Sequence, residues 1–271
     1  MKYPIQKWKR FRRRRKKQER ARRKPIPPIM IPSFFTLMNL FCGFLAILSI
    51  AEGRLFFGAW LIVSAGLFDA LDGFMARLSN ASSQFGIELD SICDIVSFGV
   101  APGLMLYMMG LNKMPFLGFI LSALPPLCGA VRLARYNVDT EIGVKSNYFW
   151  GLPIPAQAIM ISAFYLTFHN RIAVFSGSEH GINTILIPLI IVLSVLMVST
   201  LPFDKFPSFD RKTLKRYKAR LYLFIIYGLL IAIFQAIGLM IVFAAYILKG
   251  IGMGALQFWY NRFGEDPDKF I

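Results

Sequence analysis

The stretch that decides both fold and chemistry runs from Asp69 to Asp94 and reads DALDGFMARLSNASSQFGIELDSICD. Its four aspartates form two pairs: Asp69 and Asp72 are three residues apart, and Asp90 and Asp94 are four apart. Residues at either spacing share one face of a helix. We therefore expect two neighbouring helices, joined by a short link, whose four carboxylates converge on one cavity.

Long apolar runs surround this stretch and place it in a membrane. Hydrophobic residues make up 56% of the 271 residues, charged residues only 17%, and the mean hydropathy is +0.53. A soluble domain carries about 25% charged residues, so a water-soluble fold is disfavoured. The runs are also longer than the alternating strands of a membrane β-barrel. The composition predicts an all-α polytopic membrane protein, in which intramembrane carboxylates mark a function.

Seven apolar spans are expected to form transmembrane helices, the first six of them a core around the cavity. Most approach the roughly 20 residues that a helix needs to cross the hydrocarbon core. The seventh has 28 residues, about 42 Å as one helix, and is interpreted as a tilted or overlong helix or as a tight hairpin of two short helices. The spans are Ser33–Ala51, Leu55–Leu78, Gly86–Met109, Pro115–Tyr136, Pro153–Phe168, Ile182–Leu201 and Leu221–Leu248.

Basic residues are concentrated at the amino terminus. Met1–Lys24 holds fourteen Lys or Arg against one acid, which is +13 of the net charge of +16. Such an arm keeps its end in the cytoplasm by the positive-inside rule and attracts anionic lipid headgroups. The alternative is a nucleic-acid-binding arm. It is disfavoured because no nucleic-acid-binding fold follows, and we expect no nucleic acid partner.

The connections between spans support the same orientation. Pro202–Arg220 holds seven basic residues, whereas each connection on the opposite side holds one. We therefore expect a multi-pass protein of the cell (inner) membrane, with its amino terminus and its aspartates on the cytoplasmic side. The expected organisation is a basic arm (1–32), a catalytic transmembrane core (33–201), a basic cytosolic loop (202–220) and an extra transmembrane segment with a tail (221–271).

Converging carboxylates repel one another unless cations neutralise them. Oxygen ligands suit a hard divalent ion such as Mg²⁺, Mn²⁺ or Ca²⁺ rather than zinc. Arg77 adds a positive charge at the end of the first helix, and carboxylate-held metals with an arginine bind phosphate esters or diphosphates. Gly73, Ala76 and Gly86 are small, so a bulky substrate can approach the helix backbone. Taken alone, the small residues would also be explained by close packing of helices in lipid.

The pattern DxxDGxxAR, then eight residues, then GxxxDxxxD is filled at every defining position between Asp69 and Asp94. In this the chain resembles the CDP-alcohol phosphatidyltransferase family, over roughly Ser33 to Leu201. The resemblance implies transfer of a phosphatidyl group from a CDP-lipid such as CDP-diacylglycerol to an alcohol, with release of CMP. It also implies two Mg²⁺ or Mn²⁺ ions. Members of the family often form homodimers, but no motif here demonstrates one.

The resemblance also assigns roles to residues. Asp69, Asp72 and Asp90 become metal ligands, and Asp94 becomes the catalytic general base and a further ligand. The residues expected to line the CDP-lipid site are Gly73, Ala76, Arg77 and Gly86, with Thr36 and Asn39 of the first span at the depth of the nucleotide.

Two later segments resemble the phosphatidylserine synthase branch of that family. They are RLARYN at Arg132–Asn137 and NYFWGLPIPA at Asn147–Ala156. The acceptor expected from them is L-serine, whose carboxylate Arg132 or Arg135 can hold as a bidentate pair, with Asn147 as a third acceptor-binding residue. Glycerol 3-phosphate and inositol phosphate are the alternative acceptors. Either arginine alone also fits a plain cytosolic helix end.

Two other classes of protein place carboxylates in membranes. Membrane prenyltransferases hold a diphosphate with two Asp-rich motifs far apart, whereas the pairs here are only 18 residues apart. A divalent-cation transporter would explain the carboxylates but neither Arg77 nor the spacing of Gly and Ala. An enzyme is therefore the preferred interpretation.

Overall fold

The computed structural model describes residues 30–79, 84–141, 148–170, 181–204 and 218–263. Most of the predicted basic arm (1–32) and most of the last basic loop lie outside these residues. The described residues contain two strands, β1 (Tyr148–Trp150) and β2 (Pro202–Asp204). The helices are α2 (Met30–Ala51), α3 (Leu55–Ser79), α4 (Gln84–Asp94), the π-helix η1 (Ile95–Val100), α5 (Ala101–Met109), the 3₁₀ turn η2 (Leu111–Lys113), α6 (Pro115–Glu141), α7 (Ile154–Phe168), α8 (Asn183–Val198) and α10 (Lys218–Phe263).

Among the described residues, five helical segments are long and apolar enough to cross a membrane, when α10, which is interrupted at Gln235, is counted as one segment. α7 and α8 are apolar but have only 15 and 16 residues, about 22–24 Å of helix. They correspond to the predicted fifth and sixth spans. The prediction of an all-α polytopic membrane protein is confirmed. The five long segments are Phe34–Ala51, Leu55–Ala76, Gln84–Met109, Pro115–Asp139 and Ile226–Trp259.

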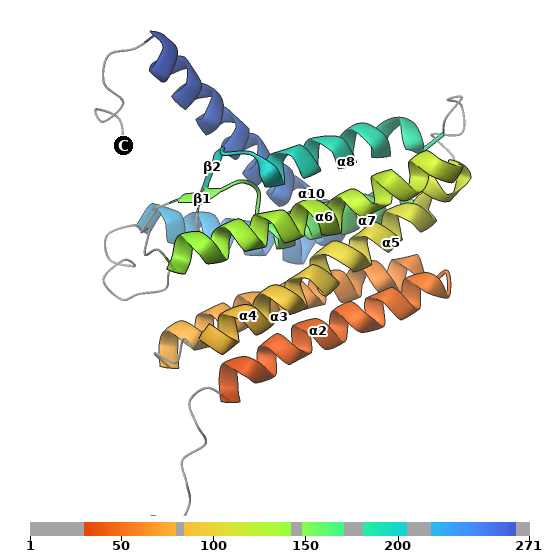
Figure 1. The fold of residues 1–271 in the computed structure, drawn as a ribbon, viewed down its shortest axis with the longest axis horizontal. Helices are drawn as coiled ribbons and strands as arrows, with labels where there is room; N and C mark the ends of the chain where they lie inside the picture. Colours follow the sequence, from red (N-terminus) through yellow and green to blue (C-terminus); the bar gives the residue numbers. More distant parts are fainter. Residues whose placement is uncertain (1–29, 80–83, 142–147, 171–180, 205–217, 264–271) are drawn as a thin grey trace, which may run out of the picture.

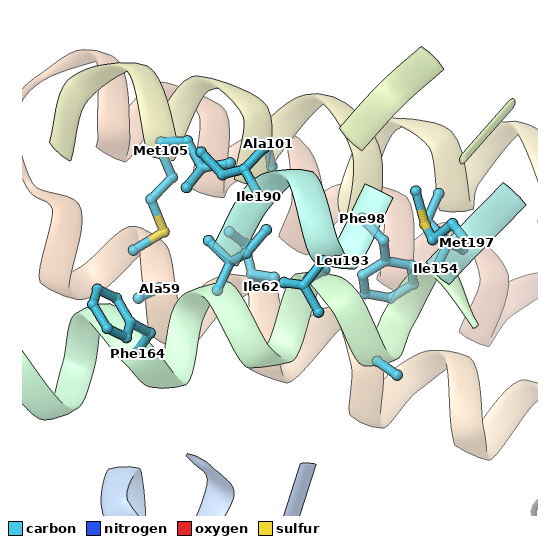
Figure 2. Close-up of a cluster of buried hydrophobic side chains, with 14 of the residues drawn as sticks. Ala59, Ile62, Phe98, Ala101, Met105, Ile154, Phe164, Ile190, Leu193 and Met197 are labelled. Atoms are coloured by element: carbon cyan, nitrogen blue, oxygen red, sulfur yellow. The ribbon is translucent and has the colours of Figure 1, made fainter. Parts of the chain in front are cut away.

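The helices α2 to α8 lie lengthwise beside one another (Figure 1). A tight turn at Gly53, whose φ of 80° suits glycine, folds α2 back against α3. The interior is apolar: Ile62, Phe98 and Met105 are fully buried and belong to one cluster with side chains of α7 and α8 (Figure 2). Large apolar side chains such as Phe116 also cover the outside, as expected of helices surrounded by lipid.

The two strands join distant connections. β1 and β2 pair antiparallel, with Phe149 opposite Phe203. They lie at the end of the bundle where α3 ends and α4 begins, which we call the aspartate end (Figure 1). Both stretches were expected to be connections between spans, and the strands were not predicted. The pairing ties the segment before α7 to the segment after α8.

The last helix, α10, consists of two arms, residues 218–234 and 236–263. Gln235 interrupts it with φ 44° and ψ −113°, values outside any helix. A Cβ on Gly238 would overlap the carbonyl oxygen of Leu230, whereas residues eight apart in a continuous helix lie about 12 Å apart. The chain therefore folds back on itself (Figure 1). Of the forms considered for the predicted seventh span, the structure has two helices with a reversal between them, but the second is not short: it continues to Phe263, past the predicted end at Leu248.

Candidate active site

Helices α3 and α4 bring three of the predicted aspartates together. Asp69, Asp90 and Asp94 each offer a carboxylate oxygen, and these oxygens all lie within 4.8 Å of one another. Asp90 and Asp94 stand one turn apart on α4, so they share one face of that helix, and their oxygens approach that of Asp69 on α3. The convergence expected from the spacing is therefore present for these three residues.

Asp72 lies beside this cluster rather than within it. Its side chain is buried, and its carboxylate accepts a hydrogen bond from the hydroxyl of Thr36 on α2. The charge of Asp72 nevertheless interacts with the charges of Asp69 and Asp90. The structure thus places the fourth aspartate at the edge of the cluster, on a hydroxyl that α2 supplies.

The first described helix also reaches Asp94. The amide Nδ2 of Asn39 donates to Asp94 Oδ1 at 3.1 Å, and Asn39 is completely buried. Thr36 and Asn39 are three residues apart, so one face of α2 holds both aspartates. These two residues were expected at the depth of the nucleotide, and in the structure they are hydrogen-bonded to the carboxylates.

A local irregularity accompanies the cluster. The α-helical turns of α4 stop at Asp94, and the π-helix η1 follows directly; such widened turns are frequent at functional sites. Within η1, Ser97 donates to the backbone carbonyl of Asn39 at 3.0 Å. A Cβ on Gly43 would overlap the Ser97 side chain. The glycine therefore lets α2 approach η1 closely enough for Asn39 to reach Asp94.

The carboxylates of the cluster repel one another unless positive charge lies nearby. Arg132 of α6 is only 7% exposed, its Nε has no hydrogen-bond partner among the described residues, and its charge interacts with those of Asp94 and Asp69. A single guanidinium cannot compensate these carboxylates, of which Asp72 and Asp94 are buried and Asp69 and Asp90 half-buried. Hard oxygen donors with excess negative charge fit a divalent cation such as Mg²⁺ or Mn²⁺, so the residues present fit a metal site.

The two predicted acceptor arginines have different surroundings. Arg132 lies near the aspartates, whereas Arg135 donates from Nη1 to the carbonyl oxygen of Val198 at 3.1 Å. Val198 is the last residue of α8, so Arg135 caps that helix. Asn147, the third predicted acceptor residue, lies outside the described residues.

The small residues predicted to line the donor site fall on the same two helices. Gly73 is exposed, and nothing described lies within 4 Å of the position that a Cβ would take. Helix packing therefore does not require this glycine. Ala76 and Gly86 are half-buried. Arg77 belongs to α3, but its side chain is outside what the structure describes.

One polar residue near this end was missed by the sequence analysis. Gln157, in the first turn of α7, has no exposed surface, and neither atom of its amide has a partner in the described part of the chain. The available signal was a glutamine inside an apolar span, directly after Gly151-Leu-Pro. A fully buried amide without partners is costly and is expected where a ligand binds.

A family model for CDP-alcohol phosphatidyltransferases matches residues 29–203. The chain therefore belongs to the CDP-alcohol phosphatidyltransferase family. That family generally uses divalent metals, in agreement with the aspartate cluster. The match ends within β2, so α10 lies beyond it.

Three individual relatives are each identical to the chain at about a third of the aligned residues. The chain is 35% identical over 203 residues to a CDP-diacylglycerol–serine O-phosphatidyltransferase of Helicobacter pylori, which covers 74% of this chain and 80% of that protein. It is 35% identical over 182 residues to the Bacillus subtilis protein of the same name, covering 67% and 92%. An archaetidylserine synthase of Methanothermobacter thermautotrophicus is 34% identical over 188 residues, covering 68% and 74%.

Proposed function

We propose that this protein transfers the phosphatidyl group of CDP-diacylglycerol to L-serine, giving phosphatidylserine and CMP in phospholipid biosynthesis. The observation that carries the proposal is the buried guanidinium of Arg132 beside the cluster of Asp69, Asp90 and Asp94. The carboxylates suit a metal-bound diphosphate donor, and the buried cation suits an acceptor that carries a carboxylate. The names of the three relatives support serine as that acceptor.

The four aspartates hold the metal in this proposal. Asp69, Asp72, Asp90 and Asp94 would bind two divalent ions, Mg²⁺ or Mn²⁺, which neutralise the diphosphate and stabilise the leaving CMP when bound. Thr36 keeps the Asp72 carboxylate turned toward α2. The exposed backbone at Gly73, with Ala76, Arg77 and Gly86, forms the path for the CDP group.

Asp94 acts as the general base. As the serine hydroxyl oxygen attacks phosphorus, Asp94 accepts the hydroxyl proton. The new oxygen–phosphorus bond forms, the phosphorus–oxygen bond to the cytidylate breaks, and CMP leaves with that electron pair. Asn39 holds one oxygen of Asp94, which leaves the other free to take the proton. A carboxylate near metal ions is a weak base, so Asp94 accepts the proton late and mainly positions the hydroxyl.

Arg132 and Gln157 form the acceptor pocket. A Cβ on Gly129 of α6 would overlap Ile154 of α7, so these two antiparallel helices touch there. Arg132 lies one turn from Gly129 on α6, and Gln157 lies one turn from Ile154 on α7. Helical side chains lean toward the amino terminus of their helix, so both lean toward the level of this contact. Arg132 would hold the serine carboxylate and Gln157 the serine ammonium, with Asn147 nearby in sequence.

The distribution of basic residues orients the protein in the membrane. The basic arm (1–32) and the loop 202–220 lie on the cytoplasmic side of the cell (inner) membrane, where the arm meets anionic lipid. The catalytic core (33–201) then opens its aspartate end to cytosolic serine. The segment 221–271 is an addition to the core, and a homodimer is the proposed assembly.

The test is a comparison of acceptors. Purified protein in lipid vesicles receives CDP-diacylglycerol, Mn²⁺ or Mg²⁺, and one labelled acceptor: serine, glycerol 3-phosphate or inositol phosphate. We expect lipid product and CMP with serine. Preferred use of either phosphate-bearing acceptor would assign a different alcohol. Movement of Mn²⁺ across the vesicle membrane without any CMP would support a transporter instead.

A further inference from the structure

Arg132 has a second neighbour besides the aspartates. Its guanidinium carbon lies over the ring of Phe149, 5.8 Å from the ring centroid. Phe149 is the central residue of β1, and Tyr136 of α6 flanks it with ring centroids 5.8 Å apart. A guanidinium stacked on a ring keeps its N–H groups in the plane available for a carboxylate. β1 is therefore part of the surroundings that orient Arg132.

Strand β1 is in turn held by β2 and by α10. Phe149 stands opposite Phe203 in the strand pair. Phe203 is fully buried, and its ring lies 5.7 Å from that of Tyr246 in the second arm of α10. A Cβ on Gly250 would overlap the Phe203 ring. The second arm is thus fitted closely against β2.

Polar contacts fix the same junction. The hydroxyl of Tyr246 donates to the backbone carbonyl of Asp204 at 3.1 Å, and the ammonium of Lys249 pairs with the Asp204 carboxylate. Tyr246 also lies within electrostatic reach of Arg132. A series of contacts therefore runs from Arg132 through Phe149 and Phe203 to Tyr246, which lies beyond the part of the chain that matches the family.

We propose that Tyr246 is a positioning residue for acceptor binding: the second arm of α10 holds the β1–β2 pair, and through it the guanidinium of Arg132, in the orientation that receives a carboxylate. This inference rests on the proposed function for the identity of the acceptor. A long side chain that is already oriented loses less conformational freedom when the acceptor binds. The effect falls on the acceptor and not on the CDP-lipid, because the donor meets other residues.

The test is the Tyr246→Phe variant in the full-length protein, with Tyr227→Phe in the first arm of α10 as the matched control. Phenylalanine keeps the ring against Phe203 and removes only the hydroxyl. We expect the serine KM to rise about 3- to 10-fold, the range for loss of one hydrogen bond, with the CDP-diacylglycerol KM unchanged. Lys249→Met should act in the same direction and more weakly, because the ion pair is exposed.

A double variant separates positioning from a general structural role. If Tyr246 acts through Arg132, then Tyr246→Phe should have little further effect on the serine KM in the Arg132→Lys background. Equal changes in both KM values with a lower melting temperature would assign Tyr246 a structural role and overturn the inference. An unchanged serine KM in Tyr246→Phe would also overturn it, provided that the wild type uses serine. A wild type that does not use serine contradicts the proposed function instead.

Discussion

Asn39 of α2 donates its side-chain amide to Asp94 of α4 at 3.1 Å, across 55 residues of sequence. The backbone carbonyl of the same Asn39 accepts a hydrogen bond from Ser97, three residues after Asp94. These two contacts attach the last residue of α4 and a residue of η1 to the side chain and the backbone of Asn39. The orientation of Asp94 is thus set by a helix outside the aspartate motif.

Asn39→Leu should lower kcat about 10- to 100-fold, the usual effect of removing a residue that orients a metal-site ligand. The KM for CDP-diacylglycerol should change less than kcat, because the amide acts on Asp94 rather than on the donor. Ser49→Ala on the same helix is the matched control, since within the described residues the Ser49 hydroxyl bonds to its own helix, at the carbonyl of Leu45. Steady-state kinetics of both variants checks this. A normal kcat in Asn39→Leu would contradict the assigned role.

The aspartates should separate into two groups by their effect on the donor. Asp69→Asn, Asp72→Asn and Asp90→Asn should each abolish turnover and weaken Mn²⁺ binding, because each removes a charged ligand. Asp94→Asn should lower kcat about 100- to 10,000-fold, as expected for a general base, while keeping more of the CDP-lipid affinity. Calorimetry with Mn²⁺ and with CDP-diacylglycerol measures both. Near-normal turnover in Asp94→Asn would exclude it as the base.

Arg132→Lys should raise the serine KM about 10- to 150-fold, corresponding to the roughly 1.5–3 kcal/mol of a charged hydrogen bond. The CDP-diacylglycerol KM should change little. Arg135→Lys is the matched comparison. Because Arg135 caps α8 at Val198, this variant should have a lower melting temperature and a nearly unchanged serine KM. A serine KM that responds to Arg135→Lys and not to Arg132→Lys would reverse the assignment.

Gln157→Met should stabilise the protein while impairing acceptor use. The side chains are similar in length, and removing an unpaired buried amide should raise the free energy of unfolding by about 1–3 kcal/mol. The serine KM should rise because the ammonium loses its partner. Thermal unfolding and acceptor kinetics on the same sample test both effects. Higher stability with an unchanged serine KM would show that Gln157 has no contact with the acceptor.

Much of this architecture was predictable from hydropathy and from the spacing of the aspartates. Apolar runs locate membrane helices because lipid requires them, and the pairs at three and four residues correctly predicted the meeting of Asp69, Asp90 and Asp94. The contacts of Thr36 and Asn39 with the aspartates were not predicted, because contacts between helices depend on how those helices rotate against each other. For the same reason the sequence did not indicate which of Arg132 and Arg135 lies near the aspartates.

The remaining differences lie toward the carboxyl terminus. The chain reverses at Gln235, a residue that carries no turn signal of its own, and the hairpin is seen only in the structure, in the backbone angles of Gln235 and the close approach of Gly238 to Leu230. The strands β1 and β2 have three residues each and come from segments about 50 residues apart, too short for a periodic pattern. Their pairing depends on tertiary contacts with α6 and α10.

Serine-dependent release of CMP reports directly on metal-dependent transfer to serine at the aspartate cluster. Purified protein with CDP-diacylglycerol and Mn²⁺ should release one CMP for each phosphatidylserine formed. Release should stop with EDTA, return with added Mn²⁺, and fall about 100-fold or more in Asp94→Asn. CMP release that is independent of serine, or phosphatidylserine formation that persists in EDTA, would exclude metal-dependent transfer to serine at this cluster.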